Sequence, residues 1–248
     1  MFTGLARKGV LSTIFFAVFV AALFHASTGL AQGLSLAAAE QLALENDPGL
    51  RAVELPLTSL ADDAERTRKM VAQVDGPVLL VGHSYGGAVI SECGDQPNVV
   101  GLVYVAAFAP DAGESPGGIT QEHPPVAAAN LAPDSDGYLW VKPEKFHESF
   151  CQDLTPDESL VMAVGQKAPL ASTFGDTVTA PAWKRKPSWY QISSADRMIA
   201  PENQQRMASR LGARKVITLD ASHASLASRP GEVSALIDEA ASAAAKGG

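Results

Sequence analysis

A short glycine-rich segment carries the residues best suited to chemistry in this chain. Gly82, Ser84 and Gly86 form a Gly-x-Ser-x-Gly pattern between the apolar run 78–81 and a run that favours a helix. This nucleophile-elbow pattern makes so tight a turn from strand to helix that its flanking positions must be nearly free of side chains. The turn would present Ser84 at a helix N-terminus, where the backbone N–H of Tyr85 can hold a developing oxyanion. We therefore predict that Ser84 is a nucleophile.

A serine hydroxyl needs a base and a carboxylate before it attacks at neutral pH. Asp196 follows a predicted strand at 188–192, and His223 lies in the loop after the next predicted strand, 215–219. Both would therefore face the sheet edge that carries Ser84. Asp220 is a rival acid, but it stands three residues before His223 in the same loop, where a hydrogen bond to the ring would be strained. We predict the triad Ser84, Asp196 and His223.

The other histidines and the two cysteines give no pattern typical of a metal site. Neither His-x-His nor HExxH spacing occurs, and no CxxC is present. We expect neither a metal nor another cofactor. His83, inside the elbow, and Cys93, in the following helix, are expected to be packed in the interior rather than reactive.

Length and charge narrow the class of protein. The 248 residues are 46% hydrophobic and 19% charged, which suits one sizeable globular domain. Lys and Arg number 19 against 27 Asp and Glu, a net charge of −8, and the basic residues are scattered. Nucleic acid is therefore not expected as a partner, because no surface would neutralise phosphates.

The elements that must position the triad alternate between strand and helix. This alternation predicts an α/β fold with a mostly parallel sheet flanked by helices. Residues 110–183 show weak periodicity and interrupt the alternation, so we expect a small cap insertion over the site. The expected strands are 78–81, 99–107, 188–192 and 215–219, and the expected helices follow Ser59, the elbow, Pro201 and, at 233–245, the last strand.

The N-terminus has two competing interpretations. Residues 1–31 contain no acid, and Arg7 and Lys8 precede the apolar run 10–24. With small residues before a cleavage point at Ala31, this order predicts a signal peptide, a periplasmic or secreted protein and no stable membrane anchor. The alternative is a cytoplasmic protein in which 15–24 is the first core strand. The domain itself would then be 32–248 in the first case and would include that strand in the second.

Five segments together resemble the α/β-hydrolase superfamily, and more closely a subgroup of small bacterial hydrolases and esterases. The resemblance covers about three quarters of the chain and implies Ser84 as nucleophile, Asp196 as acid and His223 as base. The segments are PVLLVGHSYGGAVI (77–90), VVGLVYVAAFAPDAGES (99–115), PAWKRKPSWY (181–190), SSADRMIAPE (193–202) and LDASHASL (219–226).

The chain departs from that family before the elbow. Members normally carry a His-Gly loop that supplies a second oxyanion donor, whereas here only His25-Ala26-Ser27 stands at a comparable distance. If 15–24 is the first strand, this loop could replace His-Gly; if the leader is cleaved, both are lost. The run 34–52 is also similar to the beginning of bacterial outer-membrane efflux proteins, so the front could be a fused segment.

The resemblance and the triad predict a serine hydrolase that cleaves small uncharged carboxylic esters through an acyl-serine intermediate. Two alternatives remain open from the sequence. The same fold can run lyase or cofactor-free haloperoxidase chemistry. The chain could also be a non-catalytic binding protein that lacks a complete oxyanion hole.

Overall fold

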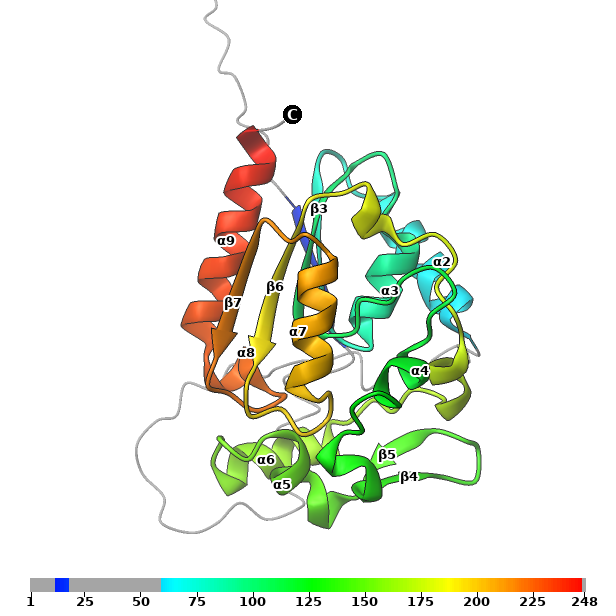
Figure 1. Cartoon of the computed structure of the whole chain (residues 1–248), viewed down its shortest axis with the longest axis vertical. Coiled ribbons are helices and arrows are strands. Elements are labelled where there is room, and N and C mark those ends of the chain that lie inside the picture. Colours follow the sequence, from blue (N-terminus) through cyan, green and yellow to red (C-terminus); the bar gives the residue numbers. More distant parts are fainter. Residues whose placement is uncertain (1–11, 18–58, 247–248) are drawn as a thin grey trace, which may run out of the picture.

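A parallel sheet of five strands forms the centre of the molecule (Figure 1). The computed structural model describes residues 12–17 and 59–246. The strand order is β1-β2-β3-β6-β7, and β4 and β5, which lie between β3 and β6 in the sequence, form a separate sheet. The strands are β1 (Ser12–Ala17), β2 (Val78–Ser84), β3 (Val99–Ala107), β6 (Ser188–Ser193) and β7 (Lys215–Leu219).

Unbroken apolar runs explain why the inner strands form. Six of the seven residues of β2 are buried, and eight of the nine in β3, as expected where helices cover both faces of a sheet. The bounds predicted for β3 and β7 are confirmed, and β2 runs on to Ser84. Extending β2 into the elbow places the serine at the carboxyl end of a central strand.

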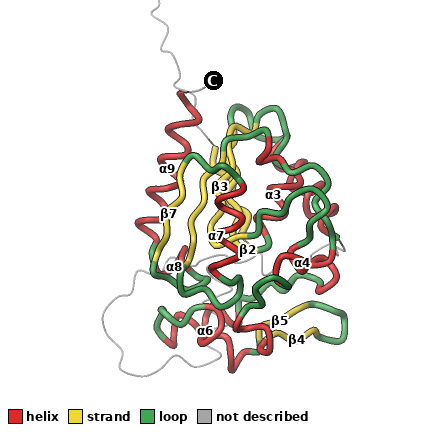
Figure 2. The backbone as a smooth tube through the Cα atoms, in the orientation of Figure 1, coloured by secondary structure: helices red, strands yellow, loops and turns green. Residues whose placement is uncertain are grey.

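Helices cover both faces of the sheet, as Figure 2 shows. On one face α2 (Leu60–Val71), α3 (Gly86–Cys93) and α7 (Pro201–Arg210) share a hydrophobic core with alternate residues of the strands. On the other face α9 (Pro230–Lys246) packs on the remaining strand residues, including Trp189. The predicted α/β architecture is therefore confirmed.

Local sequence signals fix the ends of these helices. Ser59 caps α2, since its hydroxyl accepts a hydrogen bond from Asp62 N–H. Pro201 occupies the first turn of α7, and Gly212 adopts a φ of +57° just past its end, a conformation that favours glycine. The last helix starts at Pro230 rather than at the predicted 233, because proline suits a first helical turn.

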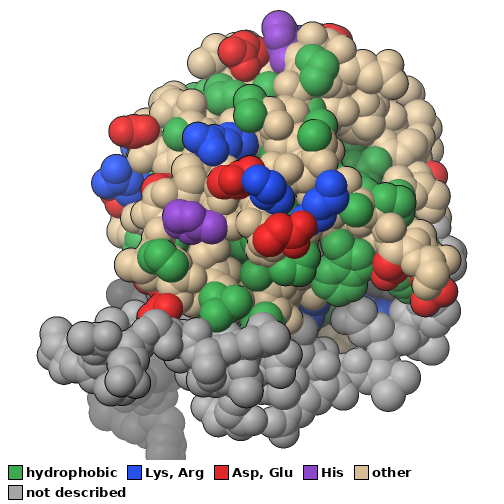
Figure 3. All heavy atoms as spheres, turned by 90° about the horizontal axis from the view of Figure 1, so that it is seen from below, with side chains coloured by type: hydrophobic (Ala, Val, Ile, Leu, Met, Phe, Trp, Pro, Cys, Tyr) green, Lys and Arg blue, Asp and Glu red, His purple; other side chains and the backbone are tan. Residues whose placement is uncertain are grey.

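Between β3 and β6 lies the cap, residues 110–183, which is built from short elements beneath the carboxyl ends of the strands (Figure 1). Its outer face carries acidic and basic side chains side by side, with hydrophobic ones between them (Figure 3). A two-stranded antiparallel hairpin within it was not predicted. The cap contains α4 (Pro116–Thr120), β4 (Leu131–Pro133), β5 (Leu139–Val141), α5 (Phe146–Phe150) and α6 (Pro156–Val164), together with four 3₁₀ turns.

At the edge of the sheet β1 pairs in parallel with β2, from Ser12 beside Val78 to Ala17 beside His83. This strand overlaps the alternative interpretation of the N-terminus only at 15–17. The predicted cleavage point, the loop 25–27 and the run 34–52 lie outside the described residues.

Two further features concern the described residues as a whole. None of their helices combines the length and apolar character needed to cross a bilayer. Cys93 and Cys151 are both buried and unpaired, Cys93 in α3 and Cys151 in the cap.

Candidate active site

Backbone geometry at the turn between β2 and α3 is strained at the serine. Ser84 adopts a φ of +55°, a left-handed conformation that serine seldom occupies outside constrained turns. A Cβ on Gly82 would lie 2.7 Å from the carbonyl oxygen of Gly86, and one on Gly87 would lie 2.1 Å from that of Phe108. The residue that follows β3 also stabilises the turn, because Phe108 N–H donates to Ser84 O at 3.0 Å. Steric exclusion on both sides therefore holds Ser84 in place.

Buried hydroxyl groups support the turn from behind. Ser91 Oγ donates to Gly87 O at 2.8 Å and lies 2.9 Å from Tyr104 Oη. Tyr190 Oη donates to Ala107 O, and the rings of Tyr104 and Tyr190 stack with centroids 5.9 Å apart. Each of these three hydroxyl groups has a partner, which favours a rigid turn.

Asp196 and His223 meet at the carboxyl edge of the sheet. His223 Nδ1 lies 2.7 Å from Asp196 Oδ2, and both side chains are fully buried. Since an ionised carboxylate only accepts, Nδ1 carries the proton and donates it, and the lone pair of Nε2 is left open. Nε2 is buried and has no hydrogen-bond partner among the described residues. A free Nε2 can accept a proton, as a general base must, but no hydrogen bond joins it to Ser84 in this structure.

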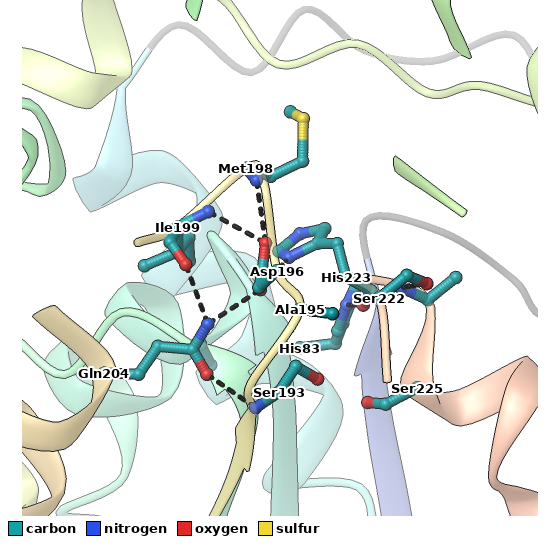
Figure 4. A network of polar contacts seen from close by, with 12 residues as sticks. His83, Ser193, Ala195, Asp196, Met198, Ile199, Gln204, Ser222, His223 and Ser225 are labelled. Carbon is teal, nitrogen blue, oxygen red and sulfur yellow. Dashed lines mark hydrogen bonds and ion pairs between the residues drawn. The ribbon is translucent and has the colours of Figure 1, made fainter. Parts of the chain in front are cut away.

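Four donors in all converge on the Asp196 carboxylate (Figure 4). Oδ1 accepts from the N–H groups of Met198 at 2.7 Å and Ile199 at 3.0 Å. Oδ2 accepts from Gln204 Nε2 at 2.7 Å as well as from His223. No role for Gln204 was predicted from the sequence. Its signal was a polar residue on the inward face of an amphipathic helix, since Gln204 is buried in α7 beside the apolar Met207 and Ala208.

Two aromatic rings pack against the imidazole of His223. His83 lies with its ring centroid 4.6 Å away, and Phe150 of the cap approaches edge-on at 4.8 Å. His83 Nε2 donates to His223 O at 2.8 Å, so its role is to hold the loop. Burial lowers the pKa of His83 to about 3, and the ring therefore stays neutral at physiological pH. The expectation that His83 is packed in the interior is confirmed.

The cap also binds the two loops that carry Asp196 and His223. Ala224 N–H donates to Phe150 O at 3.2 Å, and Gln152 Nε2 donates to Ala195 O at 2.6 Å. Asp153 Oδ2 accepts from Ser222 N–H at 2.8 Å. Segment 150–153 therefore fastens the cap to both loops.

Ser84 opens onto a cavity of about 430 Å³ between the sheet and the cap. Several of its polar lining groups are engaged elsewhere: Gln166 binds both the N–H and the carbonyl of Val141, and Thr120 Oγ1 donates to Gly117 O. The wall therefore offers mainly apolar surface. Lining residues include Tyr85, Phe108, Ala128, Leu131, Leu139, Phe150, Lys167, Pro169, Phe174, Met198 and Ile199.

Tyr85 follows the serine at the N-cap position of α3. Its hydroxyl is directed toward α2, where it donates to Asp63 Oδ2 at 2.8 Å. Burial raises the pKa of the Asp63 carboxyl. The backbone N–H of Tyr85 lies at the N-terminus of α3, directly after Ser84.

The remaining candidates lie apart from this centre. Asp220 is exposed, and the His223 nitrogen that it would need is already bound to Asp196. No group of metal-ligating side chains occurs within the described residues. The loop 25–27, considered for a second oxyanion donor, lies outside them.

Comparisons with known proteins agree with this fold. The chain is 29% identical over 203 residues to the alpha/beta hydrolase nvfD of Aspergillus novofumigatus, covering 75% of this chain and 80% of that protein. It is 26% identical over 157 residues to the probable hydrolase R7 of Phoma sp., covering 60% of this chain and 63% of R7, so it spans less than two thirds of that relative.

Solved structures of similar shape include a pyrethroid hydrolase, PytH, with a TM-score of 0.63 at 23% identity, covering 76% of this chain and 80% of that one. Polyneuridine aldehyde esterase gives 0.61 at 20% identity, with 73% and 80% covered. The Arabidopsis methylesterase MES16 gives 0.59 at 19%, with 75% and 78% covered. The family model for the alpha/beta hydrolase family matches residues 15–236, and the chain belongs to that family.

Proposed function

We propose that this protein is a serine hydrolase that cleaves small uncharged carboxylic esters through an acyl-serine intermediate. The observation that carries the proposal is the buried Asp196–His223 pair with an open Nε2, at the same edge of the sheet as a strained Ser84 that lines an apolar cavity. Esterase names among proteins of similar fold add support.

The geometry suggests the order of steps. Ser84 Oγ attacks the ester carbonyl while its proton passes to His223 Nε2, and Asp196 stabilises the imidazolium. The N–H of Tyr85 holds the oxyanion. The C–O bond to the alcohol breaks as Nε2–H protonates the leaving oxygen, and an acyl-serine remains. Water, deprotonated by Nε2, then releases the acid and restores Ser84.

The cavity supports a neutral, mainly apolar substrate. Its volume of about 430 Å³ suits a small molecule, and the amide of Gln166 and the hydroxyl of Tyr85 are already bound to protein groups. Recognition would therefore depend on shape. Lys167 also lines the cavity, so neutral esters should be compared with esters of equal length that end in a carboxylate.

Labelling of Ser84 tests the proposal directly. The full chain should react with a fluorophosphonate and hydrolyse p-nitrophenyl acetate and butyrate, whereas Ser84→Ala should do neither. Full activity of Ser84→Ala would refute the mechanism. A folded wild-type protein that turns over cyanohydrins or peroxide without labelling would favour lyase or haloperoxidase chemistry, and one that is inert in every assay would favour a binding protein.

We also propose export, on the order of charges and apolar residues in 1–31. Cleavage after Ala31 would remove β1, which pairs with β2 along six residues. The N-terminal residue of the protein isolated from its host tests this proposal: a start at Gln32 supports export, and an intact N-terminus overturns it.

A further inference from the structure

The amide of Gln204 is bound on every side. This residue of α7 is fully buried, and its Nε2 donates to Asp196 Oδ2 at 2.7 Å and to Ile199 O at 2.9 Å. Its Oε1 accepts from Ser193 N–H at 3.0 Å. One side chain therefore joins the end of β6, the loop after it and the acid (Figure 4).

These three contacts also fix which end of the amide faces the acid. A flipped amide would set Oε1 against a carboxylate and a carbonyl, and would set the NH₂ group against the N–H of Ser193. All three contacts would then be repulsive. Gln204 thus presents an N–H donor to Asp196 in the only orientation that satisfies its neighbours.

We infer that Gln204 is a positioning residue for the reaction, which anchors Asp196 Oδ2 and takes up part of its negative charge; the inference rests on the proposed function. Oδ2 is also the oxygen that accepts from His223 Nδ1. A second donor on this oxygen fixes the plane of the carboxylate and limits how strongly it draws the imidazole proton.

The titratable groups around Asp196 and His223 should not themselves shape the pH profile of ester hydrolysis. His83 of β2 packs on His223, and Tyr190 of β6 lies close enough to Asp196 for their charges to interact. Burial lowers the pKa of His83 to about 3 and raises that of Tyr190 well above its usual value. Asp153 of the cap binds Ser222; burial alone would raise its pKa, but its hydrogen bonds outweigh this, and the pKa is lowered. None of the three changes charge between about pH 5 and pH 9.

The chain offers a matched control on the same helix. Asn203 is also a fully buried amide of α7, and its Nδ2 donates to His123 O at 2.8 Å. Asn203 is not among the residues that donate a hydrogen bond to Asp196. Asn203→Leu should therefore reproduce the loss of a buried amide without touching the acid.

Gln204→Leu and Asn203→Leu should be compared with the wild type by ester hydrolysis across pH. We expect Gln204→Leu to lower kcat by about 10- to 100-fold with little change in KM. The acid limb of kcat/KM should move to higher pH by up to about one unit, because the carboxylate loses a donor and holds the imidazolium more tightly. Asn203→Leu should leave that limb in place. If both variants share one pH profile, Gln204 has only a structural role.

Gln204→Glu tests the inference in another way, because it replaces the donor with a negative charge without changing the size of the side chain. An introduced carboxylate would repel Asp196, so activity should fall at high pH and recover as the new carboxyl binds a proton and regains a donor. A profile that is unchanged in shape would overturn the inference.

One readout does not depend on catalysis. The low-field proton resonance of His223 Nδ1–H reports its bond to Asp196, and it should shift in Gln204→Leu but not in Asn203→Leu. If the wild type neither labels nor hydrolyses esters, the proposed function fails while this shift still tests Gln204. If the wild type is active and the resonance does not shift, the inference about Gln204 fails alone.

Discussion

The sheet side and the cap side of the cavity use polar groups in opposite ways. On the sheet side, hydrogen bonds lead from Gln204 through Asp196 to His223 and end at an open Nε2. On the cap side, polar groups are bound to other groups of the cap, as where the Gln166 amide binds both the N–H and the carbonyl of Val141. Under the proposed function, the first pattern would direct reactivity toward one atom, and the second would leave only shape to select the substrate. Chemistry and selectivity would then be built by separate parts of the chain.

Breaking the chain of hydrogen bonds on the sheet side should have the largest effect. Asp196→Asn and His223→Ala should each lower kcat/KM for p-nitrophenyl acetate by about four orders of magnitude, because the base loses its orientation or is absent. The cap variant Gln166→Leu, assayed in parallel, should lose far less. Equal losses in all three would show that the two sides do not differ in this way.

Steric exclusion at the elbow predicts the next effect, on stability. Gly87→Ala would force a Cβ toward Phe108 O and should lower the free energy of unfolding by about 3 kcal/mol. Gly231→Ala, in α9 and with nothing within 4 Å, should be neutral or stabilising by up to about 1 kcal/mol. Urea unfolding measures both, and similar values for the two variants would contradict the steric argument.

The buried His83 predicts a dependence of stability on pH. Its folded pKa of about 3 lies below the unfolded value of 6.5, so the unfolded chain binds this proton first as pH falls. Stability should therefore decline below about pH 6.5, by at most about 1.4 kcal/mol per pH unit from this group.

His83→Gln keeps an N–H donor for His223 O and should flatten that slope. The exposed His123→Gln serves as the control and should retain it. The measurement is the free energy of unfolding in urea from pH 7 to pH 4. A slope that is the same in His83→Gln and the wild type would mean that other groups cause it.

The smallest effect should come from the cap wall, and it should alter selectivity alone. Leu139→Ala widens the cavity and should shift the ratio of kcat/KM for hexanoate over acetate esters by about tenfold toward the longer chain. Fluorophosphonate labelling of Ser84 should stay near the wild-type rate. Val126→Ala, which removes a side chain that is 79% exposed and outside the cavity, should leave the ratio unchanged.

Much of this arrangement could be predicted because it depends on local patterns. Apolar runs gave the strands of the sheet, and strand ends gave the positions of Ser84, Asp196 and His223. The hairpin of β4 and β5 was missed because strands of three residues are too short to show alternation. Gly87 was missed because it lies one position beyond the Gly-x-Ser-x-Gly motif, although a Cβ there would meet a closer neighbour than one on Gly82.

The rest could not be predicted, because it depends on approaches across the fold. Gln204 is eight residues from Asp196, and Phe150 of the cap meets His223 from a distant part of the chain. Helical spacing places Gln204 on the inward face of α7, but neither spacing nor composition shows which residue it contacts. These contacts arise only once the strands have set the loops side by side.

The burial of both thiols has a consequence for oxidation. Burial raises the pKa of Cys93 to about 12 and that of Cys151 to about 11, so roughly one thiol in ten thousand or fewer is ionised at neutral pH. Disulfide exchange and peroxide attack, which need a thiolate, would therefore bypass these residues in a reducing or an oxidising compartment alike. Among the residues that line the cavity, the sulfur belongs to Met198, whose N–H also binds Asp196. Within the cavity, oxidants would thus act at the thioether of Met198 rather than at a cysteine.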